Sequence, residues 1–220
     1  AVEKNVHCMG ALKYRLWEWR QKRGEGIDVE ICSEGKRGDL DLVVSEMLGS
    51  IGCNEASPEA ISSSAWGEGD SLYIPQGYSS QICPVYMMLP PDRDPEGNDP
   101  LGEYSQTLIV DPRTWVGLDE FRECFHWGGR EEKGSLVKRE NTVTFKCKDR
   151  GKVTGFLGRA EVRLWGDIGM TTTDLASWGY LYLGPYPREK IDKKICEIGD
   201  TLTVRIERYL GGKYRVHILD

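Results

Sequence analysis

The chain has 220 residues, of which 39% are hydrophobic and 29% are charged, a composition typical of a globular protein and not of a disordered one. Its net charge of -6 and its pI near 5.3 argue against a dedicated duplex-binding protein, because phosphate contacts need a basic surface. No run approaches the roughly 18 apolar residues that a membrane helix needs, so we expect no membrane partner.

Strand-like segments recur from the first residues onward, separated by clusters of Gly, Pro, Asp and Ser. Such punctuation is typical of short strands joined by turns. The candidates in the N-terminal half are Leu12–Trp19, Ile27–Cys32, Ser71–Ile74, Ile82–Leu89 and Ser105–Val110.

Helical periodicity is scarce. Residues Leu40–Ile51 place several apolar side chains on one side, which predicts a short helix there. Leu118, Phe121 and Phe125 predict another, and the acidic residues 119 and 120 would favour its start.

The second half of the chain carries the clearest pattern. Leu202, Val204 and Ile206 alternate with polar residues, and a Gly-Gly turn at 211–212 leads into a second alternating run. Period-two alternation across such a turn predicts an antiparallel hairpin with one buried face. The candidate strands here are Val143–Cys147, Ala160–Trp165, Trp178–Leu183, Thr201–Arg208 and Lys213–Leu219.

About ten strands with little helix predict an all-β sandwich or barrel. Residues Pro90–Pro100 are the nearest thing to a linker, but strands are predicted on both sides, so we interpret them as a long surface loop. We therefore expect one domain over residues 1–220.

The seven cysteines are scattered, and no two lie within four residues of each other, so zinc-finger spacing is absent. Their odd number favours reduced, structural thiols in a cytosolic protein. Three disulfides with one free thiol remain the alternative. We predict no cofactor.

An acidic loop is the sharpest local pattern. Asp92, Asp94 and Glu103, with the glycine at position 97, occupy positions 1, 3, 12 and 6 of an EF-hand loop, and Glu96 adds a further carboxylate. Prolines in and before the loop, and the absence of flanking helices, disagree with an EF-hand. A solvated loop is the favoured interpretation, and a non-helical calcium site is the alternative.

Other candidate sites are weaker. Cys124 and His126 could form a thiolate–imidazole pair, although a buried structural cysteine at the end of a short helix is the simpler interpretation. No nucleophile elbow or phosphate-binding loop is present, so we expect no enzyme. A pair of carboxylates such as Asp111 and Glu120 is a weak candidate for polysaccharide hydrolysis, because such an enzyme needs its two carboxyl groups roughly 5–10 Å apart across a cleft and the sequence does not show their separation.

Two basic neighbourhoods are candidates for a subunit or RNA contact. For the N-terminal neighbourhood, around residues 15–20, ordinary packing with cation–π contacts is the alternative. The candidate contact residues are Arg15, Trp17, Trp19, Arg20, Arg205 and His217.

The order of segments resembles a known family. Val85–Pro91 followed by Gln106–Arg113 looks like two successive strands of a picorna-like capsid jelly roll. Trp178–Leu183 and the closing hairpin are similar to the last strands of small coat proteins of plant viruses of the secovirus type. The resemblance covers roughly residues 80–220 and is one of pattern.

The resemblance implies an antiparallel jelly-roll sandwich with one or two short helices, assembled with sister coat proteins into an icosahedral shell. It also implies a virion location, a host cytoplasm during assembly, and genomic RNA as a further candidate partner. An N-terminal alanine would fit release from a polyprotein.

A second resemblance is to tumour-necrosis-factor-like trimeric jelly rolls, through Leu72–Tyr78, Tyr182–Gly184 and Gly199–Val204. A structural capsid subunit is the leading hypothesis. A trimeric binding module and a β-sandwich carbohydrate-active enzyme are the alternatives.

Overall fold

The computed structural model describes residues 6–23, 42–46, 48–54, 72–87, 105–108, 112–128, 138–174, 179–185 and 194–219. The described part begins with one helix, α1 (Val6–Arg23), and the short 3-10 turns are η1 (Pro112–Thr114), η2 (Thr172–Asp174) and η4 (Leu210–Gly212). The strands are β1 (Leu42–Val44), β2 (Leu72–Ile74), β3 (Gly77–Met87), β4 (Ser105–Leu108), β5 (Trp115–Gly117), β6 (Arg122–Gly128), β7 (Lys138–Lys146), β8 (Gly151–Lys152), β9 (Gly155–Trp165), β10 (Ile168–Thr171), β11 (Tyr180–Leu183), β12 (Ile195–Cys196), β13 (Thr201–Tyr209) and β14 (Lys213–Ile218).

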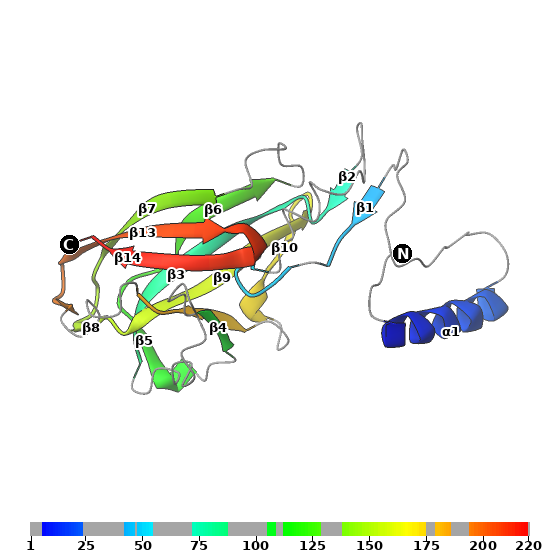
Figure 1. Cartoon of the computed structure of the whole chain (residues 1–220), viewed down its shortest axis with the longest axis horizontal. Helices are drawn as coiled ribbons and strands as arrows, with labels where there is room; N and C mark the ends of the chain where they lie inside the picture. Colours follow the sequence, from blue (N-terminus) through cyan, green and yellow to red (C-terminus); the bar gives the residue numbers. More distant parts are fainter. Residues whose placement is uncertain are drawn as a thin grey trace.

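Two antiparallel sheets make up most of this structure. The larger sheet has the strand order β4-β11-β9-β3-β5, with β10 added beside β9 and β6 beside β3. The smaller sheet has the order β14-β13-β7, and Figure 1 shows it lying in front of β3 and β9. Two short pairs, β1-β2 and β8-β12, lie outside these sheets.

The main core fills the space between the two sheets. It contains Phe145 from β7 and Phe156 from β9, whose ring centroids lie 6.3 Å apart, and both side chains are fully buried. Trp127 of β6 is also fully buried, and the guanidinium groups of Arg139 and Arg208 lie 4.1 and 5.0 Å from its ring centroid. Aromatic rings and stacked cations therefore close the core at the β6 side.

The predicted closing hairpin is confirmed. β13 pairs with β14 in antiparallel register, with Val204 opposite Ile218 and Ile206 opposite Val216, and these four side chains are buried. The turn uses a left-handed backbone at Gly211, where φ is 76°, a conformation that glycine adopts without a steric penalty. Alternation of period two thus gave the correct strands and the correct buried face.

The first predicted strand, Leu12–Trp19, is wrong, because these residues lie within helix α1. Residues 11–23 contain no Gly or Pro and are rich in Ala, Leu, Lys, Arg and Gln, which favour helix. In a strand, Trp17 and Trp19 would lie on the same face. In a helix, two successive steps turn the chain by roughly 200°, so positions 17 and 19 lie on nearly opposite sides. In Figure 1 the helix lies apart from the two sheets.

Both predicted helices are also wrong. Leu40–Ile51 contains strand β1 and the start of a buried turn, in which Gly49 and Gly52 exchange two backbone hydrogen bonds. The segment from Leu118 to Phe125 runs into strand β6, with Cys124 and Phe125 buried. Short apolar runs fit the helical and the extended periodicity about equally well, and here tertiary packing stabilises the extended conformation.

The remaining predicted strands match the structure where it describes them. β2, β3, β4, β7, β9, β11, β13 and β14 each overlap a predicted segment, whereas β1, β5, β6, β8, β10 and β12 were not predicted as strands. The predicted strand Ile27–Cys32 and the acidic loop with Asp92, Asp94, Glu96 and Glu103 lie outside the described residues. The single domain over residues 1–220 stays a prediction.

The expectation of a wholly antiparallel sandwich is wrong. β1 pairs with β2 in parallel, with Leu42 opposite Leu72 and Val44 opposite Ile74. Parallel strands need a crossover connection and normally belong to an α/β unit, which a jelly roll does not contain.

Within the described residues, no helix has the length and apolar character that crossing a membrane requires.

A buried carboxylate holds the turn before β6. The Asp119 side chain is fully buried, and its Oδ2 atom accepts hydrogen bonds from Arg122 Nε at 3.0 Å and from the backbone N–H of Lys146 at 3.0 Å. Burial raises the pKa of Asp119, but hydrogen bonds from the Glu120 and Lys146 N–H groups and from Arg122 outweigh it and hold the pKa below its ordinary value of 3.8.

This lowered pKa gives a testable pH dependence. We expect Asp119→Asn to reduce the free energy of unfolding at pH 7 by about 2 kcal/mol, because it removes a hydrogen-bonded charge. A carboxylate with a depressed folded-state pKa stabilises the fold above the unfolded-state pKa, and this contribution is lost as the pH falls through the folded-state value. The difference between the two proteins should therefore shrink below about pH 4.

Urea unfolding of both proteins between pH 7 and pH 2.5 measures this difference. Asp149→Asn, in the exposed turn after β7, is the matched control and should give no such difference. A gap between wild type and Asp119→Asn that is independent of pH would contradict the assignment.

Candidate functional site

A buried turn joins the N-terminal part of the chain to the two sheets. We call residues 48–54 the junction segment. Leu48, Ser50, Ile51 and Cys53 are at most 4% exposed, although the segment belongs to no sheet ladder. Buried backbone polar groups outside a ladder must find other partners, because leaving one unpaired costs about 1–3 kcal/mol.

Side chains of the strands supply those partners. The Thr172 hydroxyl donates to the Ser50 carbonyl at 2.6 Å, and the Ser80 hydroxyl donates to the Ile51 carbonyl at 2.7 Å. Arg208 donates from Nη2 to the Cys53 carbonyl at 3.1 Å. These donors come from η2, β3 and β13, so both sheets hold the same short turn.

The junction also contains a buried polar contact between side chains. The Cys53 thiol lies against the Tyr214 hydroxyl of β14 and 3.6 Å from the Ser80 hydroxyl. Burial raises the pKa of the Cys53 thiol and, with Cys53 nearby, raises the pKa of Tyr214 well above its ordinary value. Both groups therefore stay neutral at physiological pH and act as hydrogen-bonding groups, not as a nucleophile.

Glycines allow the close approach of the junction segment. A Cβ on Gly158 of β9 would lie 2.6 Å from Ile51 Cδ1, and a Cβ on Gly212 would collide with the backbone carbonyl of Asn54. Gly158 lies in the larger sheet and Gly212 in η4, the turn between β13 and β14 of the smaller sheet, so a larger side chain at either position would displace the junction segment.

Glu46 lies two residues before Leu48, the first residue of the junction segment. It follows strand β1, and its side chain is exposed. The backbone N–H of Ser45 donates to the Ile74 carbonyl at 2.8 Å, which extends the parallel pairing of β1 with β2 to the residue before Glu46. Ligands of open α/β sheets bind at the carboxyl ends of parallel strands, so an exposed carboxylate at this end of the β1-β2 pair is a candidate for binding a cation.

The predicted contact residues of the helix are placed only in part. Arg15 forms an ion pair with Glu18 at 3.2 Å, and Trp17 is 57% exposed beside Tyr14, with ring centroids 6.0 Å apart. The side chains of Trp19 and Arg20 lie outside the described part of α1. A contact role for these four residues stays a proposal.

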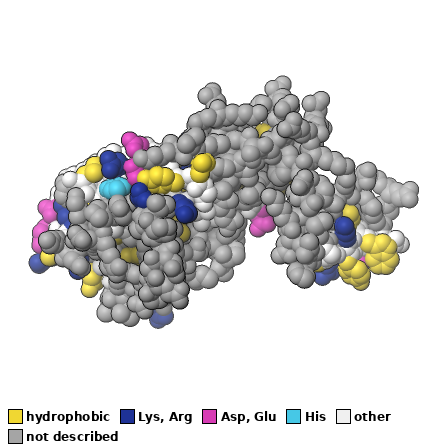
Figure 2. Space-filling view, viewed as in Figure 1, with side chains coloured by type: hydrophobic (Ala, Val, Ile, Leu, Met, Phe, Trp, Pro, Cys, Tyr) yellow, Lys and Arg dark blue, Asp and Glu magenta, His cyan; other side chains and the backbone are white. Residues whose placement is uncertain are grey.

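The other two predicted contact residues lie together on the outer face of the smaller sheet. His217 Nε2 lies 3.2 Å from Glu207 Oε2, and Arg205 Nε lies 3.9 Å from Glu207 Oε1. Figure 2 shows basic, acidic and histidine side chains gathered over β13 and β14. Arg205 and His217 thus share one carboxylate, and their role in a subunit contact stays a proposal.

The thiolate–imidazole pair is wrong. Cys124 and His126 lie two positions apart on strand β6. The Cys124 side chain is buried, and its thiol donates a hydrogen bond to the Ser80 carbonyl oxygen at 3.2 Å. The His126 side chain is 64% exposed, with Nδ1 3.6 Å from a Glu123 oxygen. The interpretation of Cys124 as a buried structural cysteine is confirmed, although in a strand and not a helix. Cys53, Cys83, Cys124, Cys147 and Cys196 are free and buried.

The candidate carboxylates for polysaccharide hydrolysis are described only in part. Glu120 is exposed and forms an ion pair with Lys148, whereas Asp111 lies outside the described residues. Among the described residues, no group of three or more His, Cys, Asp and Glu side chains could hold a metal ion.

Sequence reasoning missed Glu46 and the junction segment. The signal was present, since an apolar run at 42–44 ends in Ser-Glu and is followed by two glycines, a pattern that disfavours a helix. Three partners of the segment, Thr172, Arg208 and Tyr214, lie more than 115 positions away, and only the folded chain brings them together with it.

Comparison with known proteins points away from a capsid. The family model described as PRMT5 arginine-N-methyltransferase matches residues 1–67. Protein arginine N-methyltransferase 5 of Xenopus laevis is 29% identical over 236 aligned positions that cover 97% of this chain and 35% of that protein. Protein arginine N-methyltransferase skb1 of Schizosaccharomyces pombe is 28% identical over 66% of this chain and 26% of that protein. The chain thus spans about a quarter to a third of these relatives.

Solved structures agree at the level of fold. Arginine methyltransferase 10 of Arabidopsis thaliana has a TM-score of 0.65 at 10% identity, covering 100% of this chain and 82% of that chain. The Trypanosoma brucei PRMT1 enzyme-prozyme complex with AdoHcy has a TM-score of 0.63 at 11% identity, covering 93% and 69%. The fold is therefore that of arginine methyltransferases.

These findings correct the earlier interpretation. The jelly-roll fold class, the viral capsid function, the capsid-subunit and genomic RNA partners and the virion location are wrong, and the trimeric-ligand and carbohydrate-active alternatives are not supported. The expectation of no enzyme is also contradicted. The physical reason is that strand spacing and turn chemistry define β structure but do not define how the strands are connected.

The buried hydroxyl of Thr172 provides a test of the junction. It donates to the Ser50 carbonyl and also accepts from the Ala160 N–H at 3.0 Å, so Thr172→Val removes two buried hydrogen bonds in nearly the same volume. We expect the free energy of unfolding to fall by about 2–4 kcal/mol, from about 1–3 kcal/mol for each hydrogen bond lost.

Thermal or urea unfolding measures this loss, with Thr142→Val as the matched control on the exposed face of β7. Limited proteolysis should cut Thr172→Val faster near residues 48–54. Equal stability of the two variants would show that the junction does not depend on this bond.

Proposed function

We propose that this chain is part of a protein arginine N-methyltransferase, and that Glu46 binds the guanidinium group of the substrate arginine. Supporting this, the family model covers the residues that contain β1, Glu46 and the junction segment, and the relative from Xenopus laevis aligns along nearly the whole chain. The observation that carries the role of Glu46 is its position as an exposed carboxylate at the carboxyl end of a parallel strand.

The chemistry of the substrate agrees with this position. A guanidinium is planar, permanently charged near neutral pH and presents its N–H donors in a fixed fork that a carboxylate accepts. A carboxylate that holds it can also orient one nitrogen toward the methyl group that is transferred. Such a group must be accessible to a protein substrate, and Glu46 is exposed.

The β-sheets would then act as a rigid support. Glu46 is two residues away from Leu48, the first residue of the buried junction segment, and the Leu48 N–H donates to the Glu46 carbonyl at 2.7 Å. The backbone of Glu46 is therefore tied to a turn that both sheets hold. Sites on rigid supports keep their geometry to the precision that catalysis needs.

Methyl transfer also needs a donor. One of the similar solved structures contains AdoHcy, the demethylated form of S-adenosylmethionine, and an S-adenosyl donor would supply the electrophilic methyl group.

A methylation assay with the natural full-length protein tests the proposal. Transfer of a tritiated methyl group from S-adenosylmethionine to an arginine-containing peptide should be detectable and should be lost when lysine replaces arginine. We expect Glu46→Gln to lower kcat/KM by about 100-fold, because a charge-assisted hydrogen bond contributes up to roughly 3 kcal/mol.

Glu140→Gln is the matched control, since Glu140 is an exposed carboxylate on β7. It should leave kcat/KM unchanged. The absence of methyl transfer to arginine peptides by the full-length protein would contradict the function, whereas full activity of Glu46→Gln would contradict only the role of Glu46.

A further inference from the structure

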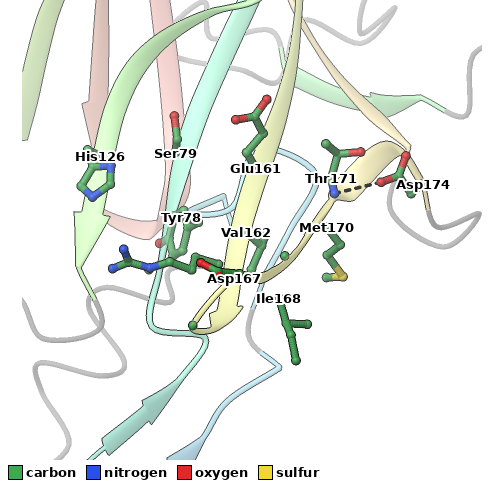
Figure 3. A pocket seen from close by; sticks show the side chains of 14 residues that line it. Tyr78, Ser79, His126, Glu161, Val162, Asp167, Ile168, Met170, Thr171 and Asp174 are labelled. Atoms are coloured by element: carbon green, nitrogen blue, oxygen red, sulfur yellow. Dashed lines mark hydrogen bonds between the residues drawn. The ribbon is translucent and has the colours of Figure 1, made fainter.

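An open hollow of about 560 Å³ lies on the outer face of the larger sheet, over β6, β3, β9 and β10. Figure 3 shows its lining, with side chains from all four strands. The strand register places His126, Ser79, Glu161 and Thr171 in one row across the sheet. The row is polar from one side to the other, unlike the apolar face that the same strands turn toward the core.

The next row along the strands is almost bare of side chains. Gly128, Gly77, Arg163 and Gly169 are opposite one another in register, so three of the four positions carry no side chain. A Cβ on Gly77 would lie 2.5 Å from the Trp127 carbonyl oxygen, and one on Gly169 would lie 2.8 Å from the Val162 carbonyl oxygen. This glycine row therefore keeps a trough where an extended peptide can approach the sheet closely.

The hollow carries an excess of negative charge. Its lining contains the carboxylates of Glu161, Asp167 and Asp174 and the single guanidinium of Arg163. Hydrogen bonds from the hydroxyl and the backbone N–H of Thr171 hold the pKa of Asp174 below its ordinary value, so this group is ionised at neutral pH. A cationic ligand would therefore be attracted, and an anionic one repelled.

Other charged groups at the border do not reverse this sign. Arg159 Nη2 lies 3.3 Å from a Glu161 oxygen, which leaves part of that carboxylate's charge compensated. Glu123 accepts a hydrogen bond from the Ser79 hydroxyl at 2.5 Å and adds a fourth carboxylate beside His126. Counting Arg159 and Glu123, four carboxylates face two guanidinium groups.

An exposed indole lies at the end of the hollow. Trp165 is 42% exposed and pairs in register with Ile168, which lines the hollow and is 64% exposed. An exposed tryptophan ring beside carboxylates can stack on a guanidinium, and this cation–π contact contributes to the recognition of arginine more than of lysine.

We infer that this hollow is a docking site for an extended, basic segment of the protein substrate, one with several arginines, at a place separate from Glu46. The inference rests on the proposed function, because it assigns the ligand to a substrate of arginine methylation. Charge complementarity, the glycine trough and the exposed indole all favour this occupant. A nucleic acid has the wrong sign of charge for the same surface.

The hollow and the junction share their supporting strands. Thr171 lines the hollow, while the next residue, Thr172, donates to the Ser50 carbonyl of the junction segment. Tyr78 lines the floor of the hollow, and a Cβ on Gly52 would collide with its ring. A docked segment would thus be held by the same framework that positions Glu46.

The test is direct binding to the natural full-length protein. The probes are three fluorescein-labelled peptides of equal length in which glycine alternates with arginine, with lysine or with glutamate. We expect the arginine peptide to bind most tightly, with an affinity that falls as salt rises, and the glutamate peptide not to bind. Equal binding of all three peptides would overturn the inference.

The main variant is Glu161→Gln with Asp167→Asn, and Asp167→Lys alone reverses a charge in an exposed turn without touching the Arg159 ion pair. Each should weaken binding of the arginine peptide by about tenfold. The double variant loses two exposed ion pairs with the peptide, and Asp167→Lys replaces an attractive charge with a repulsive one. Trp165→Ala should reduce the preference for arginine over lysine. The control, Glu140→Gln with Asp149→Asn, removes two carboxylates elsewhere and should bind normally.

Binding and methylation separate this inference from the proposed function. If Asp167→Lys binds the arginine peptide as tightly as wild type, the docking site is wrong, even when Glu46→Gln loses methyl transfer. If the peptide binds through the hollow but no arginine is ever methylated, the docking site stands and the proposed function fails. The ratio of kcat/KM for a long over a short arginine peptide should also fall by about tenfold in Asp167→Lys.

Discussion

The buried junction segment constrains the rest of the structure more than any single strand does. A turn that is shielded from water and belongs to no ladder can exist only if other groups satisfy its carbonyls. Here Thr172, Ser80 and Arg208 do so from three separate elements. The positions of η2, β3 and β13 are therefore fixed relative to one another by a few polar contacts as well as by the apolar core.

This constraint links fold and proposed activity. Arg208 bonds to the Cys53 carbonyl and stacks over Trp127, so the same guanidinium closes the core and holds the turn. Buried cations are costly unless they are hydrogen-bonded, and such groups favour one specific arrangement. The backbone position of Glu46, a few residues upstream, depends on this arrangement. The hollow on the opposite face of β3 and β9 depends on the same arrangement.

Part of this architecture could be predicted from the sequence and part could not. The closing hairpin and the strands β7, β9 and β11 were predictable because period two and glycine turns are local signals. Helix α1 was predicted to be a strand, because its aromatic and basic residues also alternate along the sequence. The connectivity of the strands was not predictable, since the same alternation fits a jelly roll and a methyltransferase barrel.

The candidate sites were harder to predict than the fold. Glu46 was hidden within a segment read as a helix, and the row of His126, Ser79, Glu161 and Thr171 exists only through the register of four strands. Each of these residues is unremarkable in sequence, because none forms a motif with its neighbours along the chain. The negative net charge of the chain does not indicate where its carboxylates gather.

The junction also has a consequence for how the chain acquires its structure. Cys53 meets Arg208 and Tyr214 across 155 and 161 positions of sequence. Contacts of such long range are slow to form, because loop closure must precede any gain from packing. On the ribosome, residues 48–54 would emerge long before β13 and β14, so the segment that carries Glu46 must wait, with its carbonyls solvated, until the closing hairpin has been synthesised.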